Sequence, residues 1–294
     1  MNQLALSIAG LRLLVESDDP FPPTFVGEKL KPFVVADNAS AEPHIRIRWR
    51  DADPRHLTLG PELFVPGSVW RMHAPADGSN GCVGVISYSD DGRLSEHAAV
   101  VEVDPAWSEI ALTEKSRPAP WSSLLALGAG ELIVRTRIIL ENGLVFHSSA
   151  IDDNGRGILM VGHAGAGKST QASIWATQPG AIALSDDRVG VRLDGSQAVA
   201  YGTPWGGTAG IARNHSVPLH AILVLEQAPE NALAPLAPAD AAPLLLARCF
   251  LPYWSGRMIG DAMDIMIKLL SAVPIYQFRC VPDESVIPVV RSVL

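Results

Sequence analysis

Residues 162–169 constrain the fold of this chain more than any other segment. They read Gly-His-Ala-Gly-Ala-Gly-Lys-Ser and match the spacing G-x-x-x-x-G-K-[ST]. Glycines let successive backbone N–H groups curl around phosphate oxygens, Lys168 can reach the outer phosphates, and the Ser169 hydroxyl can ligate Mg²⁺. The residues predicted to hold the phosphates are Gly162, His163, Ala164, Gly165, Ala166, Gly167, Lys168, Ser169 and Thr170.

The segments on either side support a phosphate loop over a simple glycine-rich turn. Residues 157–161 form a short apolar run of the strand type, and residues 170–176 can continue as a helix whose N-terminus faces the phosphates. A strand, a glycine loop and a helix in this order predict an α/β fold with a nucleotide site.

The amino-acid composition is typical of a globular protein. The chain has 294 residues, of which 48% are hydrophobic and 18% charged, and its formal charge is -8. With this acidic balance and no dense Lys/Arg block, we expect no nucleic-acid partner. No apolar run reaches the ~20 residues needed to span a bilayer, and no basic leader is present, so we expect a cytoplasmic protein without a membrane partner. The three cysteines, Cys82, Cys249 and Cys280, are widely spaced and are interpreted as buried thiols.

The N-terminal part predicts a mostly antiparallel β domain. Short strand-like runs alternate with turn residues up to about residue 115. The expected strands are Leu4 to Glu16, His44 to Arg50, Leu63 to His73, Cys82 to Ser89 and Ala98 to Val103. The proline-rich segment 114–120 suggests a boundary, which gives a β-rich domain over 1–118, expected to serve substrate or partner recognition, and a phosphate-loop domain over 119–294.

The second part alternates strands and helices. The pattern predicts helices at Trp121 to Leu140, Ala239 to Phe250 and Gly260 to Leu270. Strands are expected at 144–151, 157–161, 181–184, 189–193, 198–201 and 220–226, with Asn154-Gly155 turning a hairpin between the first two. The Ala- and Pro-rich stretch 228–243 is predicted to be a surface excursion.

A pair of acids follows one of these strands. Asp186 and Asp187 end an apolar run 18 residues after Lys168. If that strand packs beside the one feeding the loop, both acids reach the sheet edge where ligands collect. Phosphoryl transfer needs a carboxylate on Mg²⁺ and, for a hydroxyl acceptor, a carboxylate that accepts its proton, so the pair could divide these roles. The alternative is an Asp-Asp turn that simply closes the strand.

Three further residues are weaker candidates. His147, in the strand before the hairpin, could contact a phosphate or an aspartate, although a lone histidine in an apolar strand is more often structural. Thr203, in the glycine-rich stretch 202–210, could approach an acceptor or a phosphate, or belong to a flexible turn. Arg248 could steady the transferring phosphate or make a surface ion pair.

The run Phe146 to Thr170, with the following aspartate pair, resembles the catalytic core of the HPr kinase/phosphorylase family. The resemblance covers roughly 144–191, about a sixth of the chain. It implies a phosphate-loop domain of the HPr kinase/phosphoenolpyruvate carboxykinase type, a mixed sheet with helices, that uses ATP and Mg²⁺ to phosphorylate a serine. It also implies catalytic roles for Lys168, His147 and the two aspartates, with Ser169 and Asp187 on the metal, and it is compatible with a homo-oligomer.

One departure from that family redirects the expected substrate. True HPr kinases carry a metal-binding glutamate in a short glycine-containing stretch, whereas residues 202–210 here contain no acid. Their Gly-Thr-Pro-Trp sequence resembles instead the HPr-kinase-like proteins of peptide natural-product clusters, including the lasso-peptide kinases. This resemblance implies a peptide or small-protein acceptor.

Three hypotheses for function remain at this stage. The first is a Mg²⁺/ATP-dependent kinase acting on a serine-type hydroxyl of a peptide or small protein. The second is a nucleotide-binding regulatory or scaffold protein that transfers no phosphate. The third is a kinase for a free small metabolite.

Overall fold

The computed structural model describes residues 1–36, 42–65, 70–87, 99–116 and 122–294. The chain divides into two compact units. The N-terminal unit comprises Met1–Arg137 and Pro252–Gly256, and the loop-bearing unit comprises Ile138–Leu251 and Arg257–Leu294. The predicted boundary after residue 118 lies outside the described residues. Contacts divide the chain after Arg137, which assigns the first long helix to the N-terminal unit.

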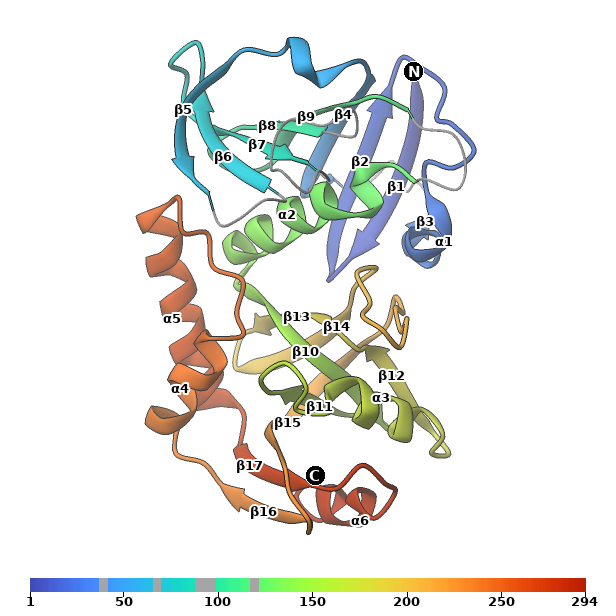
Figure 1. Ribbon diagram of the computed structural model, residues 1–294, viewed down its shortest axis with the longest axis vertical. Helices are drawn as coiled ribbons and strands as arrows, with labels where there is room; N and C mark the ends of the chain where they lie inside the picture. Colours follow the sequence, from blue (N-terminus) through green and yellow to red (C-terminus); the bar gives the residue numbers. More distant parts are fainter. Residues whose placement is uncertain (37–41, 66–69, 88–98, 117–121) are drawn as a thin grey trace. The chain divides into compact units, whose positions relative to one another are not determined.

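Within its described residues, the N-terminal unit forms a nine-stranded sheet in the order β3-β1-β2-β4-β9-β8-β7-β6-β5 (Figure 1). The expected antiparallel pairing dominates, but β4 pairs in parallel with both β2 and β9. The strands are β1 Asn2–Ile8, β2 Leu11–Ser17, β3 Val34–Val35, β4 Ile45–Asp51, β5 Leu59–Phe64, β6 Trp70–Pro75, β7 Cys82–Ile86, β8 Ala99–Val103 and β9 Glu109–Glu114.

Two predicted strands of this unit were wrong in extent, and two strands, β3 and β9, were not predicted. The run Leu4 to Glu16 is a hairpin, because Ala9 and Gly10 take positive φ of 52° and 72° and reverse the chain. An alanine rarely adopts this conformation, so the sequence carried no turn signal. The run Leu63 to His73 covers the antiparallel pair β5 and β6, and its residues 66–69 lie outside the described part.

Short helices complete the N-terminal unit. They are α1 Gly27–Leu30, α2 Gly128–Arg137 and the 3-10 turns Lys31–Phe33, Pro54–His56 and Leu124–Ala126. Helix α2 is shorter than the predicted helix Trp121 to Leu140, whose start lies outside the described residues. It packs on the sheet through Leu132, whose Cδ2 atom would lie 2.7 Å from a Cβ placed on Gly84. A larger residue at position 84 of β7 would therefore displace the end of the Leu132 side chain.

The loop-bearing unit is a mixed α/β unit around a second sheet, eight-stranded within the described residues. Its strands are β10 Gly143–Asp153, β11 Arg156–Val161, β12 Ala181–Ser185, β13 Arg188–Asp194, β14 Gln197–Gly202, β15 Ser216–Gln227, β16 Ala232–Pro235 and β17 Ile275–Cys280. Its helices are α3 Lys168–Ala176, α4 Pro238–Leu246, α5 Gly256–Ala272, which begins in the neighbouring unit, and α6 Val286–Arg291, with a 3-10 turn at Ile138–Glu141. Strand β16 replaces part of the predicted surface excursion, and β17 and α6 were not predicted.

The long strand β10 organises this sheet. Its first half pairs with β13, and its second half pairs with β11 on one side and β12 on the other. The Asn154-Gly155 hairpin is confirmed: both residues take positive φ, and Asp153 pairs with Arg156 across the turn. The sequence reasoning considered that β12 packs beside β11, but the two strands are not neighbours. Because β10 stands between them and is antiparallel to both, β11 and β12 still end at the same edge of the sheet.

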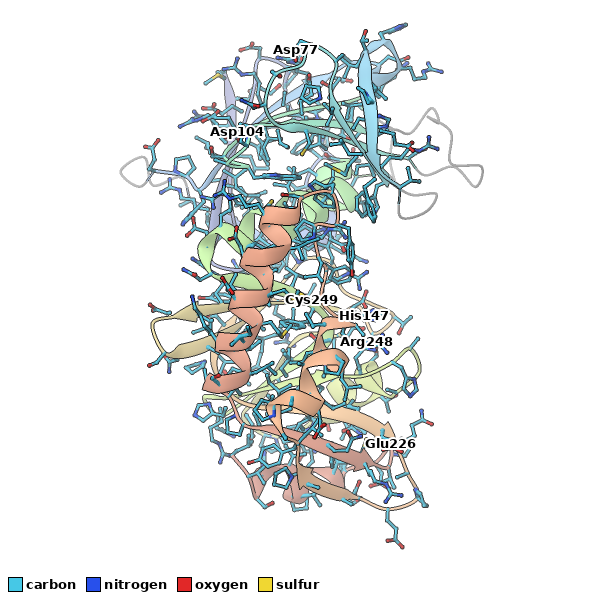
Figure 2. The ribbon with its side chains drawn as sticks, turned by 90° about the vertical axis from the view of Figure 1, so that its left-hand side faces the viewer. Asp77, Asp104, His147, Glu226, Arg248 and Cys249 are labelled. Atoms are coloured by element: carbon cyan, nitrogen blue, oxygen red, sulfur yellow. The ribbon has the colours of Figure 1, made fainter. Side chains whose placement is uncertain are left out.

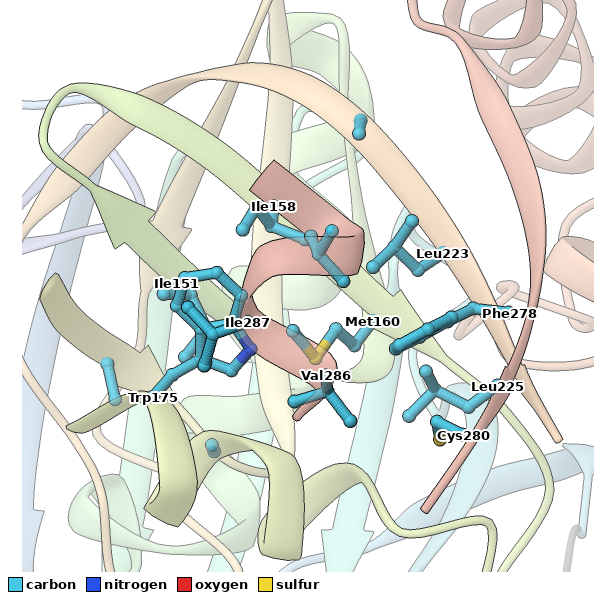
Figure 3. Packing of buried hydrophobic residues seen from close by; sticks show 14 of the residues in the cluster. Ile151, Ile158, Met160, Trp175, Leu223, Leu225, Phe278, Cys280, Val286 and Ile287 are labelled. Carbon is cyan, nitrogen blue, oxygen red and sulfur yellow. The ribbon is translucent and has the colours of Figure 1, made fainter. Parts of the chain in front are cut away.

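The core of the loop-bearing unit lies between the sheet and helices α3 and α6 (Figure 3). Trp175 of α3 and Phe278 of β17 are fully buried. The sheet side is built from aliphatic residues of β10, β11 and β15, and α6 adds Val286, Ile287 and Val290. This packing fixes α3, and with it the N-terminal end of the helix that follows residues 162–167.

Two further findings concern the chain as a whole. Across the described residues, every helix is too short or too polar to span a bilayer. The three cysteines are free and buried, as predicted, and burial raises the pKa of Cys82 and of Cys249 to about 12. Thiols with such a pKa are unreactive at neutral pH.

Candidate functional site

The glycine-rich loop joins the end of β11 to the start of α3. Gly165 and Gly167 take φ of 81° and 100°, a conformation that side chains disfavour. A Cβ on Gly162 would lie 2.7 Å from the Cβ of Ala166, a buried residue. The glycines at 162, 165 and 167 are therefore required by the backbone of this loop, which turns into the N-terminus of α3.

Lys168 is drawn into the loop. Its Nζ atom donates to the carbonyl oxygens of Gly162 at 3.1 Å and His163 at 3.2 Å, and only 6% of the residue is exposed. Burial and the charges of Arg248 and Arg188 lower the pKa of Lys168, while Asp187 opposes that shift. The lysine is thus a desolvated cation enclosed by the loop, which is the state in which a phosphate partner stabilises it most.

Four other residues of this segment lie at or near the surface. Ser169 is half-buried and donates to the backbone oxygen of Asp186 at 3.4 Å, a long contact. Thr170, His163 and Ala164 are exposed, and a ring nitrogen of His163 lies 2.7 Å from the Ala164 carbonyl. The Ser169 hydroxyl therefore lies beside the peptide that links the two aspartates.

The two aspartates diverge where β12 has ended. Asp186 is 1% exposed, and its carboxylate accepts three backbone N–H groups. Oδ1 accepts from Gly207 at 2.8 Å and Ile211 at 3.1 Å, and Oδ2 accepts from Ala209 at 2.8 Å. The side chain thus fixes the glycine-rich loop that follows β14.

Asp187 points to a different set of partners. Its Oδ1 lies 3.0 Å from Nε2 of His147 and 2.7 Å from Nη1 of Arg188. His147 and Arg188 are directly opposed in the antiparallel pair of β10 and β13, which explains why both reach one carboxylate. Burial raises the pKa of Asp187, but the hydrogen bond from His147 and the charges of Arg188, His147 and Lys168 outweigh it, so the net pKa lies below the ordinary carboxyl value.

Arg248 reaches this region through the backbone. The segment after α4 runs along β10, where the N–H of His147 donates to the carbonyl of Arg248 at 2.7 Å and Phe146 forms a bridge with Cys249. His147 and Arg248 accordingly lie next to each other in Figure 2. Arg248 is close enough for its charge to lower the pKa of Lys168.

Thr203 is the predicted residue that the structure sets apart from the others. It is fully buried, and its hydroxyl donates to the carbonyl of Arg188 at 2.7 Å. This bond ties the end of β14 to the start of β13, next to Asp187 in sequence.

The charges that converge on Asp187 and the loop are mostly positive. The charges of Lys168 and Arg188 act on the carboxylate of Asp187, and Arg248 lies close enough to act on Lys168. The carboxylate of Asp186 is enclosed by backbone N–H groups. Such an arrangement favours a ligand with several negative charges, such as a polyphosphate. The sequence reasoning did not select Arg188. Its place opposite His147 follows from the pairing of β10 with β13, which no local pattern in the sequence specifies.

The residues present fit a magnesium ion only in company with phosphate. Among the described residues, no group of three or more His, Cys, Asp or Glu side chains is placed to hold a metal ion. The Ser169 hydroxyl and the Asp187 carboxylate are the oxygen donors at this edge. Mg²⁺ commonly takes one or two protein oxygens and completes its shell with substrate phosphates and water.

Comparisons with known proteins place these features in context. No curated protein matches the chain. Among solved structures, the Hpr(Ser) kinase/phosphatase from Coxiella burnetii matches with 13% sequence identity and a TM-score of 0.30, over 51% of this chain and 87% of that one. At this score the match does not by itself establish a shared fold.

A match to a family model includes the functional region. The family described as SynChlorMet cassette protein ScmC matches residues 117–281. This range is more than half of the chain and includes the glycine-rich loop, both aspartates, His147, Thr203 and Arg248. The chain belongs to the family of the SynChlorMet cassette protein ScmC.

Proposed function

We propose that this protein is a Mg²⁺/ATP-dependent phosphotransferase of the HPr kinase-like type that phosphorylates a serine-type hydroxyl on a peptide or small protein. One observation carries the proposal: a carboxylate held by a histidine and an arginine lies at the sheet edge where β11 delivers the loop lysine. Kinases need a phosphate cradle, cations for the transferring group and a carboxylate for the acceptor proton.

The loop supplies the cradle. Its backbone N–H groups and Lys168 bind the phosphates. To do so, Nζ of Lys168 gives up its hydrogen bonds to the carbonyls of Gly162 and His163 and donates to phosphate oxygens instead. Magnesium, when bound, neutralises charge on the phosphates, and the Ser169 hydroxyl would hold it together with phosphate oxygens and water, which leaves Asp187 for the acceptor. Arg188 and Arg248 lie where they can neutralise charge that develops on the transferring phosphoryl group.

We assign to Asp187 the role of the base that accepts the proton of the acceptor hydroxyl. The acceptor oxygen forms its bond to the terminal phosphorus as the bond from that phosphorus to the bridging oxygen breaks, ADP leaves, and the hydroxyl proton passes to Asp187. His147 orients the carboxylate through the 3.0 Å contact. Asp187 is ionised at neutral pH, and because its lowered pKa makes it a weak base, it takes the proton only as the new bond to phosphorus forms. We assign Asp186 to holding the loop after β14, since both its oxygens are taken.

The test is serine-dependent release of ADP from Mg²⁺-ATP in the presence of short serine-containing peptides. Replacing a general base typically costs 10²- to 10⁴-fold in rate, so Asp187→Asn should fall by about that factor. Asp194→Asn removes an exposed carboxylate from the same strand as Arg188 and serves as the control, with the parent's rate expected. A folded Asp187→Asn protein that works as fast as the parent would overturn the assignment.

A second function is favoured by one specific observation. With Asp186 enclosed and no acid in residues 202–210, the site offers fewer free carboxylates than the family of HPr kinases uses. A nucleotide-binding regulatory protein needs none for proton transfer. Tight binding of Mg²⁺-ATP without phosphorylation of any peptide or of free serine would support this second function, and phosphorylation of free serine alone would identify a metabolite kinase.

A further inference from the structure

The ring of Phe250 lies against the guanidinium group of Arg188. Cζ of Arg188 is over the face of the ring, 4.5 Å from its centre. Phe250 is half-buried and the Arg188 side chain is 20% exposed, so water reaches this contact only in part. A cation over an aromatic face at such a distance is attracted by the ring quadrupole, more strongly where water is excluded. The proposed chemistry gives Phe250 no role.

Strand pairing explains how these two side chains meet. Arg188 of β13 is directly opposite His147 of β10. Residues 248–250 lie along the other edge of β10, where the N–H of Phe250 donates to the carbonyl of Val145 at 3.0 Å. The backbones of Arg188 and Phe250 are therefore on either side of β10, about 10 Å apart. Only long side chains can meet over the strand between them.

Phe250 belongs to the face of the sheet that carries the site. Residues directly opposite each other in neighbouring strands share a face, and side chains alternate along each strand. His147 is opposite Arg188 on one side and Arg248 on the other. Phe250 is two residues after Arg248 and so shares their face. The aromatic ring is thus placed among the charged groups of the site.

The ring contact leaves the polar edge of Arg188 for charged partners. The planar guanidinium carries five N–H donors, and a ring that covers its face uses none of them. Nη1 of Arg188 lies 2.7 Å from Oδ1 of Asp187. The hydroxyl of Thr203 donates to the Arg188 carbonyl and holds its backbone. Phe250 and Asp187 therefore restrict a long side chain before any ligand arrives, which lowers the entropy lost on binding.

We propose that Phe250 is a positioning residue, which holds the guanidinium of Arg188 beside Asp187 where it meets the transferring phosphoryl group. This role rests on the proposed function, in which Arg188 neutralises charge on that group. A leucine at position 250 would fill much of the same space, but it has no quadrupole to hold a cation. A tyrosine would keep the aromatic face.

Steady-state kinetics of serine-peptide phosphorylation test this role. Phe250→Leu should lower kcat by about five- to tenfold, within the range of a cation–π contact, and leave the KM for Mg²⁺-ATP within twofold of the parent's. Phe250→Tyr should keep kcat within twofold. Phe21→Leu is the control, because Phe21 is a half-buried phenylalanine that contacts another ring in the N-terminal unit, and it should behave as the parent. Urea unfolding verifies that each variant is folded.

The same substitution in an Arg188→Ala background shows whether Phe250 acts through Arg188. There, Phe250→Leu should change kcat less than twofold, because the cation that the ring holds is gone. An equal loss in both backgrounds, equal losses in Phe250→Leu and Phe250→Tyr, or a folded Phe250→Leu protein with the parent's kcat would overturn the role of Phe250 and leave the proposed function standing. Absence of peptide phosphorylation by the parent would overturn the proposed function and, with it, this inference.

Discussion

Replacing Asp186 by Asn should separate the roles of the two adjacent aspartates. The Asp186 carboxylate is buried and accepts N–H groups from Gly207, Ala209 and Ile211. An asparagine can keep its oxygen on Gly207 and Ile211, but its amide then presents hydrogens to the N–H of Ala209. Two charge-assisted bonds become neutral ones, and the third is replaced by two opposed donors.

The expected loss of stability is about 2–4 kcal/mol. Bonds to a charged group contribute roughly 1 kcal/mol more than neutral ones, and an unsatisfied donor costs about 1–3 kcal/mol. The exposed Ala209 reduces the second contribution, because water can reach that end of the loop. By contrast, Asp187 and His147 are 25% and 40% exposed in their side chains, so Asp187→Asn should cost about 1 kcal/mol or less.

Urea unfolding of the two variants and the parent measures this difference. The free energy of unfolding should fall for Asp186→Asn and stay close to the parent for Asp187→Asn, with an unchanged dependence on urea concentration. Phosphotransfer should show the opposite order, with the larger loss in Asp187→Asn. The reasoning is refuted if Asp186→Asn is as stable as the parent, or if Asp187→Asn is the less stable of the two.

Three further predictions follow from contacts in the two units. The Asp153 side chain is fully buried and pairs with Arg291 of α6 at 2.7 Å. Asp153→Asn should lower the free energy of unfolding, measured by thermal unfolding, by about 2–3 kcal/mol. This loss is smaller than for a fully buried pair because the Arg291 side chain is 35% exposed. The hydrogen bond and charge of Arg291 hold the pKa of Asp153 below its ordinary value. The stabilisation that ionised Asp153 contributes is therefore complete above about pH 4 and is lost as the pH falls through the lower pKa of the folded state. When the free energy of unfolding is measured at decreasing pH, Asp153→Asn should lose less than the parent. In the N-terminal unit, Glu114 accepts a hydrogen bond from the indole N–H of Trp49 at 2.9 Å. Glu114→Leu should lower the free energy of unfolding in urea by about 1–3 kcal/mol. An unchanged free energy would contradict the role of this buried bond.

Local chemistry explains which parts of the structure could be predicted from the sequence. The Asn154-Gly155 hairpin and the turn into α3 require glycine or asparagine in positive φ, and these residues are visible in the sequence. The hairpin of β1 and β2 turns at Ala9-Gly10, where Ala9 is held by the pairing of its strands rather than by its own preference. Strand β17, which pairs in parallel with β15, depends on a partner about fifty residues away, and no local pattern reveals it.

The candidate site divides in the same way. The loop and the aspartate pair were found because their residue types are tied to one spacing. The separate directions of Asp186 and Asp187 depend on contacts with residues 207–211 and with β10, which no local pattern in the sequence specifies.

The claim on which the proposed function depends is that residues 162–169 bind nucleotide phosphates. Thermal unfolding of the parent, Lys168→Ala and Lys268→Ala, with and without Mg²⁺-ATP, tests it directly, and Lys268 is an exposed lysine of α5 that serves as the control. Each shift is measured from that variant's own ligand-free value. At ~100 times its dissociation constant, the nucleotide should stabilise the parent and Lys268→Ala by about 2.7 kcal/mol, and Lys168→Ala should lose most of that gain. No stabilisation of the parent by ATP, GTP or pyrophosphate, or an equal shift in Lys168→Ala, would contradict the claim.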